Sequence, residues 1–519
     1  MNNPIPYFLE YVQAVIGLQG NEQKGLMLWL AEIYSAIDDK RVIDANQLIR
    51  GAKKFGLSEW GKAQVFLGQG DFYASLQSWD EAVGMYQNAL SLLELSHSPD
   101  DERAVVTNNL GLVYQNQGMY DDAQRCFETA LTFYENVGNL DGKIHAISNL
   151  ASVFDERGDW SKAIQNYEQG IKLLSQSGKK EDLASLLNNV GVVYQKAGQI
   201  VQAETILQRC VDLLDETGLA HSPHGVRVLM NLGEVYATLG QAHQAIHCLE
   251  SAISICQELS DADLEISVWN NLGTIYLNQN DTINAISCFS KSLELGREFL
   301  SWDTQALALS NLGAAYEELR ENDKALMLYE QSLALSQDIH DLYGIARAQN
   351  NIGVLFEKQG DFHQAILHYE QARNKLHEIS DYYRETIAVI NIASLYARMN
   401  DISRAWEWHQ LGYQLANKHA YTDLLVSLEV LNGDLNFSSS SKLDTGCNSY
   451  ARACELALLS NPQSLYKFME IARQRSEWLD DEGRNLFCQR LLEKCGDALK
   501  RTVPDFYEHL ASGGKKNAS

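Results

Sequence analysis

The segment Asn109-Leu110-Gly111-Leu112-Val113-Tyr114 sets the period of most of the chain. Its asparagine returns seven times, at steps of 40, 40, 42, 40, 40, 40 and 40 residues. The one longer step contains Pro223, which we interpret as part of a two-residue loop insertion. Copies in phase at this period are typical of an array of stacked repeats. The asparagines are Asn109, Asn149, Asn189, Asn231, Asn271, Asn311, Asn351 and Asn391.

Three further columns accompany each asparagine. Fourteen residues later stands an alanine, from Ala123 in the first copy to Ala405 in the last. Between them lies a turn position, which carries glycine in five copies, as at Gly118, and asparagine or arginine in the others. Glycine and asparagine tolerate the positive φ that a tight connection between helices needs. Four residues after the alanine comes a large side chain, usually aromatic, as at Phe127.

These spacings predict two helices in each repeat. Leu110, Gly111 and Tyr114 are spaced to share one face of a first helix, and Ala123 and Phe127 share one face of a second. Small residues let two helices approach closely, and the aromatic side chains fill the remaining space. An isolated pair cannot bury its apolar face, but stacked pairs can, which predicts a solenoid.

The columns resemble the tetratricopeptide repeat, with Leu-Gly, Tyr, Gly, Ala and an aromatic residue at that family's offsets. The resemblance covers residues 104 to about 420, and a ninth copy precedes them at Gly70, Tyr73 and Ala82. The family's usual period is about 34 residues, so these helices should each be about one turn longer. The longer form resembles the repeats of kinesin light chain, Pins-type adaptors and Rap-type peptide receptors. The resemblance implies an all-α fold, a right-handed alpha-alpha superhelix with capping helices at both ends.

The ends of the chain lack the repeat columns. We predict a helical cap or degenerate repeat over residues 1–60, nine repeats over 61–421, a degenerate repeat with capping helices over 422–511, and a disordered tail over 512–519. A solenoid needs such atypical units at its ends. Within the C-terminal part we expect a loop at 438–442 and helices near Thr422–Phe437, Ser449–Leu459, Gln463–Arg475 and Asp481–Lys500.

Packing explains the asparagine column least well. Asparagine has a poor helix propensity, and a buried amide needs a hydrogen-bonding partner. The column resembles the asparagine ladder of O-linked N-acetylglucosamine transferase, in which such side chains hold the main chain of an extended peptide. That resemblance places the eight asparagines on a concave groove, where each amide could offer a donor and an acceptor to a bound segment. The alternative is that each asparagine bonds the backbone of the neighbouring repeat and sets the stacking.

Residues beside the ladder would give a groove its specificity. Later positions in the first helices carry more carboxylates than basic residues, the latter being Lys196, Lys358 and Arg398. This predicts a polar, mildly acidic groove that favours a neutral or basic segment, unlike the basic carboxylate clamp of chaperone-binding tetratricopeptide domains. The alternative is that the carboxylates only form a solvated face. The candidate partner-binding residues beside the ladder are Asn108, Asn188, Asn270, Asn350, Glu234 and Glu317.

The charge balance limits the partners further. The chain has 42 basic and 68 acidic residues, a net charge of −26, so we expect it to bind neither nucleic acid nor a membrane surface. Residues 1–6 show no basic region leading into an apolar run, and we expect no secretory signal. The nine cysteines form no CxxC pair, which favours reduced thiols and a cytoplasmic location.

Signals for catalysis are weak. The motifs HExxH, GxxxxGK[ST], GxSxG and GxGxxG are absent from the sequence. His243 and His247 stand four residues apart, but no third metal ligand is near, and His247 and Cys248 project in different directions from one helix. Cys488 and Cys495 are interpreted as the buried stripe of a capping helix. We predict no catalytic residues, no metal and no cofactor.

Two functional hypotheses follow. The first is a non-catalytic scaffold or adaptor that binds an extended peptide or partner segment in the concave groove. The second is a regulatory sensor, whose superhelix responds to a peptide or partner and controls a separate effector such as a protease, a phosphatase or a transcription factor. The oligomeric state is not predicted.

Overall fold

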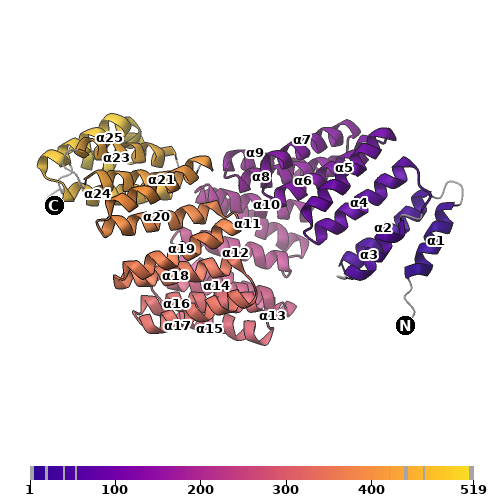
Figure 1. The fold of residues 1–519 in the computed structure, drawn as a ribbon, viewed down its shortest axis with the longest axis horizontal. Coiled ribbons are helices and arrows are strands. Elements are labelled where there is room, and N and C mark those ends of the chain that lie inside the picture. Colours follow the sequence, from indigo (N-terminus) through magenta and orange to yellow (C-terminus); the bar gives the residue numbers. More distant parts are fainter. Residues whose placement is uncertain are drawn as a thin grey trace. The chain divides into compact units, whose positions relative to one another are not determined.

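The structure, a computed structural model, describes residues 5–17, 22–38, 41–52, 55–419, 421–437, 442–459 and 462–513. It contains 26 α-helices, and these ranges hold no β-strand. The predicted all-α fold class is therefore confirmed (Figure 1). Within the described ranges, no helix is both long enough and apolar enough to cross a membrane.

The first eleven helices contain the predicted N-terminal cap and the repeats up to residue 217. They are α1 (Ile5–Gly17), α2 (Glu22–Asp38), α3 (Val42–Gly51), α4 (Glu59–Ser75), α5 (Trp79–Leu95), α6 (Asp100–Asn116), α7 (Tyr120–Val137), α8 (Leu140–Glu156), α9 (Trp160–Ser177), α10 (Lys180–Lys196) and α11 (Ile200–Thr217).

The other fifteen helices continue the array and end in the C-terminal helices. They are α12 (Pro223–Thr238), α13 (Ala242–Leu259), α14 (Ala262–Asn278), α15 (Thr282–Glu298), α16 (Trp302–Glu318), α17 (Asn322–Asp338), α18 (Leu342–Gln359), α19 (Phe362–Glu378), α20 (Tyr382–Arg398), α21 (Ile402–Lys418), α22 (Thr422–Phe437), α23 (Leu443–Leu459), α24 (Pro462–Trp478), α25 (Asp481–Thr502) and α26 (Pro504–Ala511).

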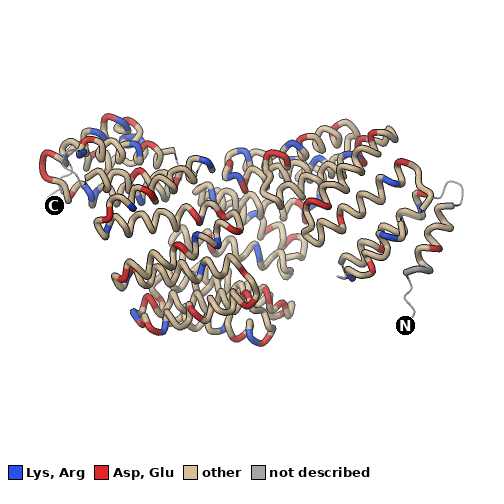
Figure 2. The backbone as a smooth tube through the Cα atoms, in the orientation of Figure 1, with Lys and Arg blue, Asp and Glu red and all other residues tan. Residues whose placement is uncertain are grey.

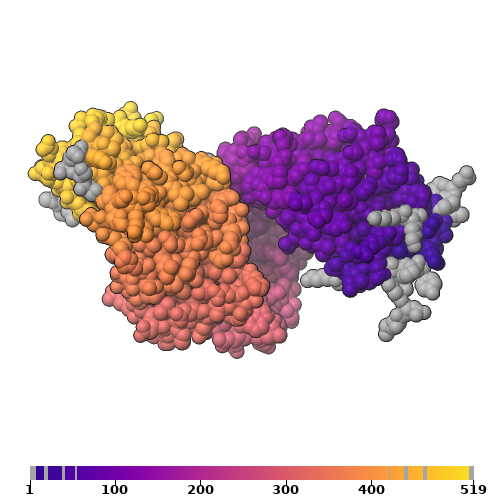
Figure 3. Space-filling view, in the orientation of Figure 1, coloured from indigo at the N-terminus to yellow at the C-terminus, as the bar shows by residue number. Residues whose placement is uncertain are grey.

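The chain divides into two compact units. Unit 1 comprises Met1–Ala197 and Val201–Thr217, and unit 2 comprises Gly198–Ile200 and Gly218–Ser519. In each unit successive helices pack side by side, and the space-filling view shows a continuous surface over them (Figures 1 and 3). The units meet in sequence at the predicted insertion, whose proline begins α12. Pro223 suits the first turn of a helix, where its missing N–H removes no hydrogen bond, and the side chain of Ser222 caps that turn.

Each repeat is held together where its two helices cross. Ala123, Phe127 and Ala130 of α7 are completely buried. A Cβ atom added to Gly111 of α6 would lie 2.7 Å from Cε1 of the Phe127 ring, so only glycine lets the ring sit against the α6 backbone. The predicted pairing of small residues with large ones is thus confirmed as the contact between first and second helices.

The turns within the repeats have the predicted backbone conformation. At Gly118 the φ angle is +72°, and Met119 N–H donates to the carbonyl oxygen of Tyr114, as in a Schellman motif. Arg320 adopts a φ of +59° at the same position of its repeat. All eight predicted turn positions have positive φ, namely Gly118, Gly158, Gly198, Gly240, Asn280, Arg320, Gly360 and Asn400.

The turns between repeats contain a second set of positive φ angles. These were not predicted from the sequence. Only some of these residues are glycines, such as Gly138, whereas Leu300 has a φ of +56°. The varied residue types explain why no column was visible at this position. The set comprises His97, Gly138, Gly178, Gly218, Ser260, Leu300, His340 and Ser380.

The C-terminal helices differ from the prediction in extent. The helix expected from Ser449 begins at Leu443, the one expected to end at Arg475 continues to Trp478, and α26 was not predicted. Cys488 and Cys495 of α25 are buried, as interpreted from their spacing. The expected loop lies largely outside the described residues, as does the expected tail from residue 514 onward.

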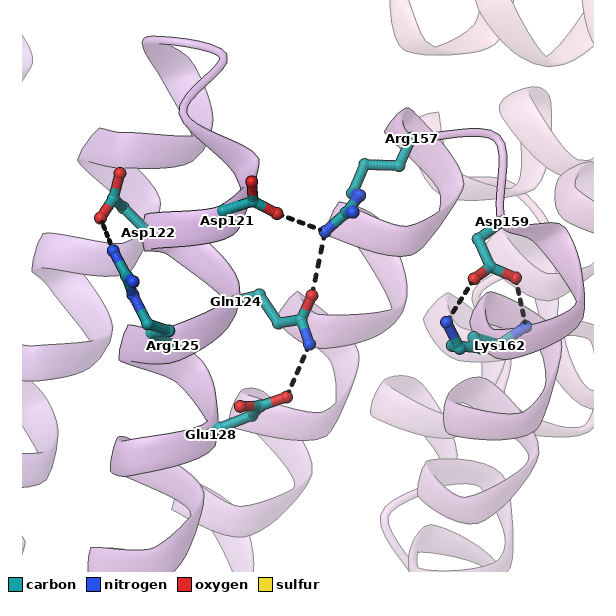
Figure 4. Close-up of polar contacts among 8 residues, drawn as sticks. All are labelled: Asp121, Asp122, Gln124, Arg125, Glu128, Arg157, Asp159 and Lys162. Atoms are coloured by element: carbon teal, nitrogen blue, oxygen red, sulfur yellow. Dashed lines mark hydrogen bonds and ion pairs between the residues drawn. The ribbon is translucent and has the colours of Figure 1, made fainter. Parts of the chain in front are cut away.

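Surface charges also join neighbouring repeats. Arg157, at the end of α8, donates hydrogen bonds of 2.9 Å to Asp121 and 3.0 Å to Gln124 of α7 (Figure 4). Gln124 in turn donates to Glu128 one turn further along α7. Acidic and basic residues are interspersed along the helices of both units (Figure 2). Some of the surface charge is therefore paired within the chain.

Substitution of Gly118 by alanine should destabilise the protein by about 1 kcal/mol, since an L-residue in the left-handed region costs about 1–2 kcal/mol, partly offset by a stiffer unfolded chain. Gly84→Ala is the matched control, because Gly84 lies in α5 and, as at Gly118, an added Cβ would contact nothing within 4 Å. That control should be neutral or stabilising by up to about 1 kcal/mol. Urea unfolding followed by circular dichroism measures both, and equal effects would contradict this explanation.

Candidate peptide-binding groove

The eight ladder asparagines lie on the first helices of their repeats, from α6 to α20. In unit 2, α14 contacts both α12 and α16, whereas no comparable contact joins the described residues of the second helices α13 and α15. In unit 1, α6 likewise contacts α4 and α8. The first helices are therefore closer together and line the inner side of each unit. We call this side the ladder face.

Several ladder asparagines bond the preceding repeat. Nδ2 of Asn149 donates to Oδ1 of Asn108 at 2.9 Å, and Nδ2 of Asn311 donates to Oδ1 of Asn270 at 3.2 Å. In the same way Asn351 donates to Oγ of Ser310 at 2.9 Å, and Asn109 donates to the carboxylate of Asp71 at 3.1 Å. The bonded atoms belong to side chains of the neighbouring repeat, whereas the alternative raised by the sequence was a bond to its backbone. These amides therefore help to join the repeats.

Each of these contacts uses the N–H donor of the asparagine amide and leaves its oxygen acceptor unused. The amide oxygens of Asn149, Asn311 and Asn351 accept no hydrogen bond from the described residues. All three side chains are half-buried, so their oxygens are within reach of a molecule on the ladder face. Joining repeats and binding a segment are compatible roles, because an amide carries both a donor and an acceptor.

Two other ladder asparagines line cavities. Asn271 and Asn391 make no side-chain hydrogen bond with the described part of the chain, and each borders a hollow on the ladder face of unit 2. Asn271 has no partner in the preceding repeat because the residue there that is equivalent to Asn270 is Met230, which offers no strong hydrogen-bond acceptor. Asn189 is exposed, while Asn188 and Asn231 both have polar contacts.

The two cavities differ in their lining. The α12–α14 cavity, of about 460 Å³, is bordered by Asn271, Glu234 and the apolar side chains of Met230 and Ile275. The α20–α24 cavity, of about 420 Å³, lies among α20, α22 and α24, and more of its lining residues are apolar, among them Phe468. Both combine apolar surface with a few polar groups, as small binding sites commonly do.

Several charged groups of the ladder face form ion pairs between repeats. Lys196 contacts Asp155 at 2.7 Å, in unit 1. Lys358 contacts Glu317, and Arg398 contacts Glu357, at 2.5 Å in each case, in unit 2. Each pair joins a carboxylate six residues after one ladder asparagine to a base seven residues after the next.

The Glu317 pair lies deepest. The Glu317 side chain is only 8% exposed, and it also accepts a 2.9 Å hydrogen bond from the Tyr329 hydroxyl. Burial, followed by the nearby Glu317 charge, raises the pKa of Tyr329, and the hydrogen bond to Glu317 raises the pKa of Lys358. The charge of Glu317 is thus balanced inside the chain. Glu234, the other candidate carboxylate, is exposed and forms no ion pair with the described residues.

The remaining candidate residues take varied positions. Asn270 is 4% exposed and donates to Oγ of Ser292 and to the carbonyl oxygen of Ile266. Asn350 is half-buried. His243 and His247 are both exposed, and no group of three or more potential metal ligands occurs among the described residues.

A double-mutant cycle tests the contribution of the buried pair. Combining Glu317→Gln with Lys358→Met should give a coupling free energy of about 1 kcal/mol, because the carboxylate is shielded from water although the ammonium is about half exposed. The exposed pair Lys375–Glu378 is the control, with an expected coupling of about 0.3 kcal/mol. Chemical denaturation measures both, and equal couplings would show that the ladder-face pair is only a surface contact.

The repeats, the paired helices and the ladder face together define a helical-repeat scaffold. Matches to the tetratricopeptide repeat family cover residues 62–136, 102–176, 182–258, 264–338 and 304–376. The chain therefore belongs to the tetratricopeptide repeat family. Proteins of this fold are typically non-catalytic interaction scaffolds, and the match indicates no catalytic family.

Several solved structures are similar to the chain at low sequence identity. The apo form of RapI is 12% identical, with a TM-score of 0.51, and the alignment covers 69% of this chain and 98% of RapI. The apo form of the quorum sensor NprR from B. thuringiensis is 14% identical, with a TM-score of 0.47 and coverages of 64% and 97%. BtubC (BKLC) from P. vanneervenii is 20% identical, with a TM-score of 0.39 and coverages of 43% and 92%. Comparison with curated protein sequences finds no match.

Proposed function

We propose that the chain is a non-catalytic interaction scaffold that binds an extended, neutral or basic segment of a partner along the ladder face. The observation that carries the proposal is the ladder itself, because asparagine amides with unused acceptors recur on one side of the stacked helices. A peptide main chain offers N–H donors and carbonyl acceptors at regular intervals. Amides along the ladder face suit that pattern and do not depend on the sequence of the segment.

The cavities support a contribution from the side chains of the segment. Asn271 and Asn391 place unpartnered amides at the edges of two hollows that contain apolar surface. A bound segment could therefore bury side chains beside the asparagines that hold its main chain. Such anchors usually supply much of the binding energy.

The charge of the chain favours the proposed kind of partner. A net charge of −26 would attract a basic segment and repel an acidic one. The proposal places the chain in the cytoplasm, because nine free cysteines suit a reducing compartment. The regulatory sensor described above remains the alternative prediction.

The test uses linear twelve-residue peptides displayed on phage and selected on the full-length protein. For a selected peptide, Asn271→Ala/Asn391→Ala should weaken binding at least about tenfold, since each lost hydrogen bond is worth about 0.5–1.5 kcal/mol. These two asparagines are chosen because neither joins repeats through its side chain, so folding should be unaffected. Isothermal titration calorimetry measures the affinity, and circular dichroism checks the fold.

Asn166→Ala/Asn417→Ala is the matched control. Both lie on second helices, Asn166 half-buried and Asn417 exposed, and the amide of each donates to a carbonyl oxygen of its own helix, at Lys162 and Tyr413. This variant should bind like the wild type. Equal affinity of the ladder variant and the wild type, or failure of every peptide to bind the wild type, would contradict the proposal.

A further inference from the structure

The α12–α14 junction on the ladder face of unit 2 lacks the ion pair found at the α16–α18 and α18–α20 junctions. Between α16 and α18 the pair is Glu317 with Lys358, which are 41 residues apart. At the same positions of α12 and α14, and at the same separation, stand Ala237 and Asn278. Neither the carboxylate nor the ammonium group is therefore present there. The α12–α14 cavity is bordered by both of these smaller residues.

The cavity retains one carboxylate. Glu234 lies on α12, one helical turn before Thr238, and its side chain borders the cavity without an ion pair to the described residues. No lysine or arginine is among the lining residues, so this charge has no internal counter-ion at the cavity. By contrast, the charge of Glu317 is balanced by Lys358, and its carboxylate also accepts a hydrogen bond from the Tyr329 hydroxyl. An unbalanced carboxylate beside a hollow favours a cationic occupant.

The rest of the lining fits a long aliphatic stem. Met230 and Ile275 supply apolar surface, and the amide of Asn271 has no partner among the described residues. Lysine and arginine bury an aliphatic stem against apolar surface while their charged end meets a carboxylate or an amide oxygen. An aspartate or glutamate would meet Glu234 with no cation nearby, and a purely aliphatic side chain would leave Glu234 without a counter-charge.

We propose that the α12–α14 cavity is an anchor site for a lysine or arginine side chain of the bound segment. The stem packs on Met230 and Ile275, and the charged group pairs with Glu234. At the α16–α18 junction the basic group is Lys358 of the chain itself. At the α12–α14 cavity the bound segment would supply the basic group instead. This proposal rests on the proposed function. It adds that one position of the bound segment carries lysine or arginine.

The test repeats the phage selection, with the same peptide library, on the wild type and on Glu234→Arg. Peptides selected on the wild type should share a lysine or arginine at one fixed position, and Glu234→Arg should select aspartate or glutamate there. Replacing the shared basic residue by norleucine should weaken binding to the wild type about tenfold or more, the value of one charge-assisted hydrogen bond. Glu330→Arg, an exposed position on the second helix α17, is the control and should leave the selected residues unchanged.

A second variant tests the cavity without removing its carboxylate. Ala237→Glu/Asn278→Lys installs the residue types found at Glu317 and Lys358 and should fill the cavity with an internal ion pair. It should abolish the preference for a basic residue while leaving Asn271 in place. Circular dichroism and thermal unfolding confirm that each variant is folded.

The possible outcomes separate the two proposals. Peptides whose binding depends on Asn271 and Asn391 but which share no basic residue would overturn the anchor site and leave the scaffold function standing. An unchanged basic preference on Glu234→Arg would also overturn the anchor site. If no peptide is enriched on the wild type, both proposals fail.

Discussion

The close approach of the two helices within each repeat is the contact on which the rest of the structure depends. At Gly111 the α6 backbone touches the Phe127 ring, and a single Cβ atom would separate them. The same arrangement recurs at Gly273 with Phe289 and at Gly353 with Tyr369. Because the helices of a pair are held this closely, the pair presents apolar surface on both sides, and successive pairs stack to bury it. Regular stacking then aligns the asparagines on the ladder face.

Several polar side chains on the ladder face form contacts between stacked repeats, and the groups used in these contacts are therefore not free to bind a partner. The Asn149 amide and the Glu317 carboxylate both join neighbouring repeats, although from sequence alone they were candidate partner contacts. Under the proposed function, the groups open to a partner include the unused amide oxygens, the two hollows on the ladder face of unit 2 and exposed groups such as Glu234. In a repeat protein, the polar groups that can bind a partner are thus those that the contacts between repeats leave unpaired.

The sequence predicted more of the fold than of the site. The period, the helix pairs and the turn at Gly118 followed from columns of residues, because each column reports a local constraint such as a positive φ or a close helix contact. The ion pairs between repeats were present as a pattern, an acid six residues after one asparagine and a base seven after the next. Their significance was missed because a charge on a helix surface does not by itself show which neighbour it meets. The turns between repeats were missed because residues as different as Gly138 and Leu300 adopt the same φ.

The sequence alone therefore determined the repeat family, the all-α architecture and the position of the ladder, all of which depend on spacing within a single repeat. Only the tertiary structure decided which polar groups are used and which are open. Glu317 and Glu234 are both carboxylates on first helices, yet one is buried in an ion pair and the other borders a cavity. Glu317 meets Lys358, which lies about forty positions away on the next repeat and comes into contact with it only when the repeats are stacked, whereas Glu234 meets no basic residue among those that line its cavity.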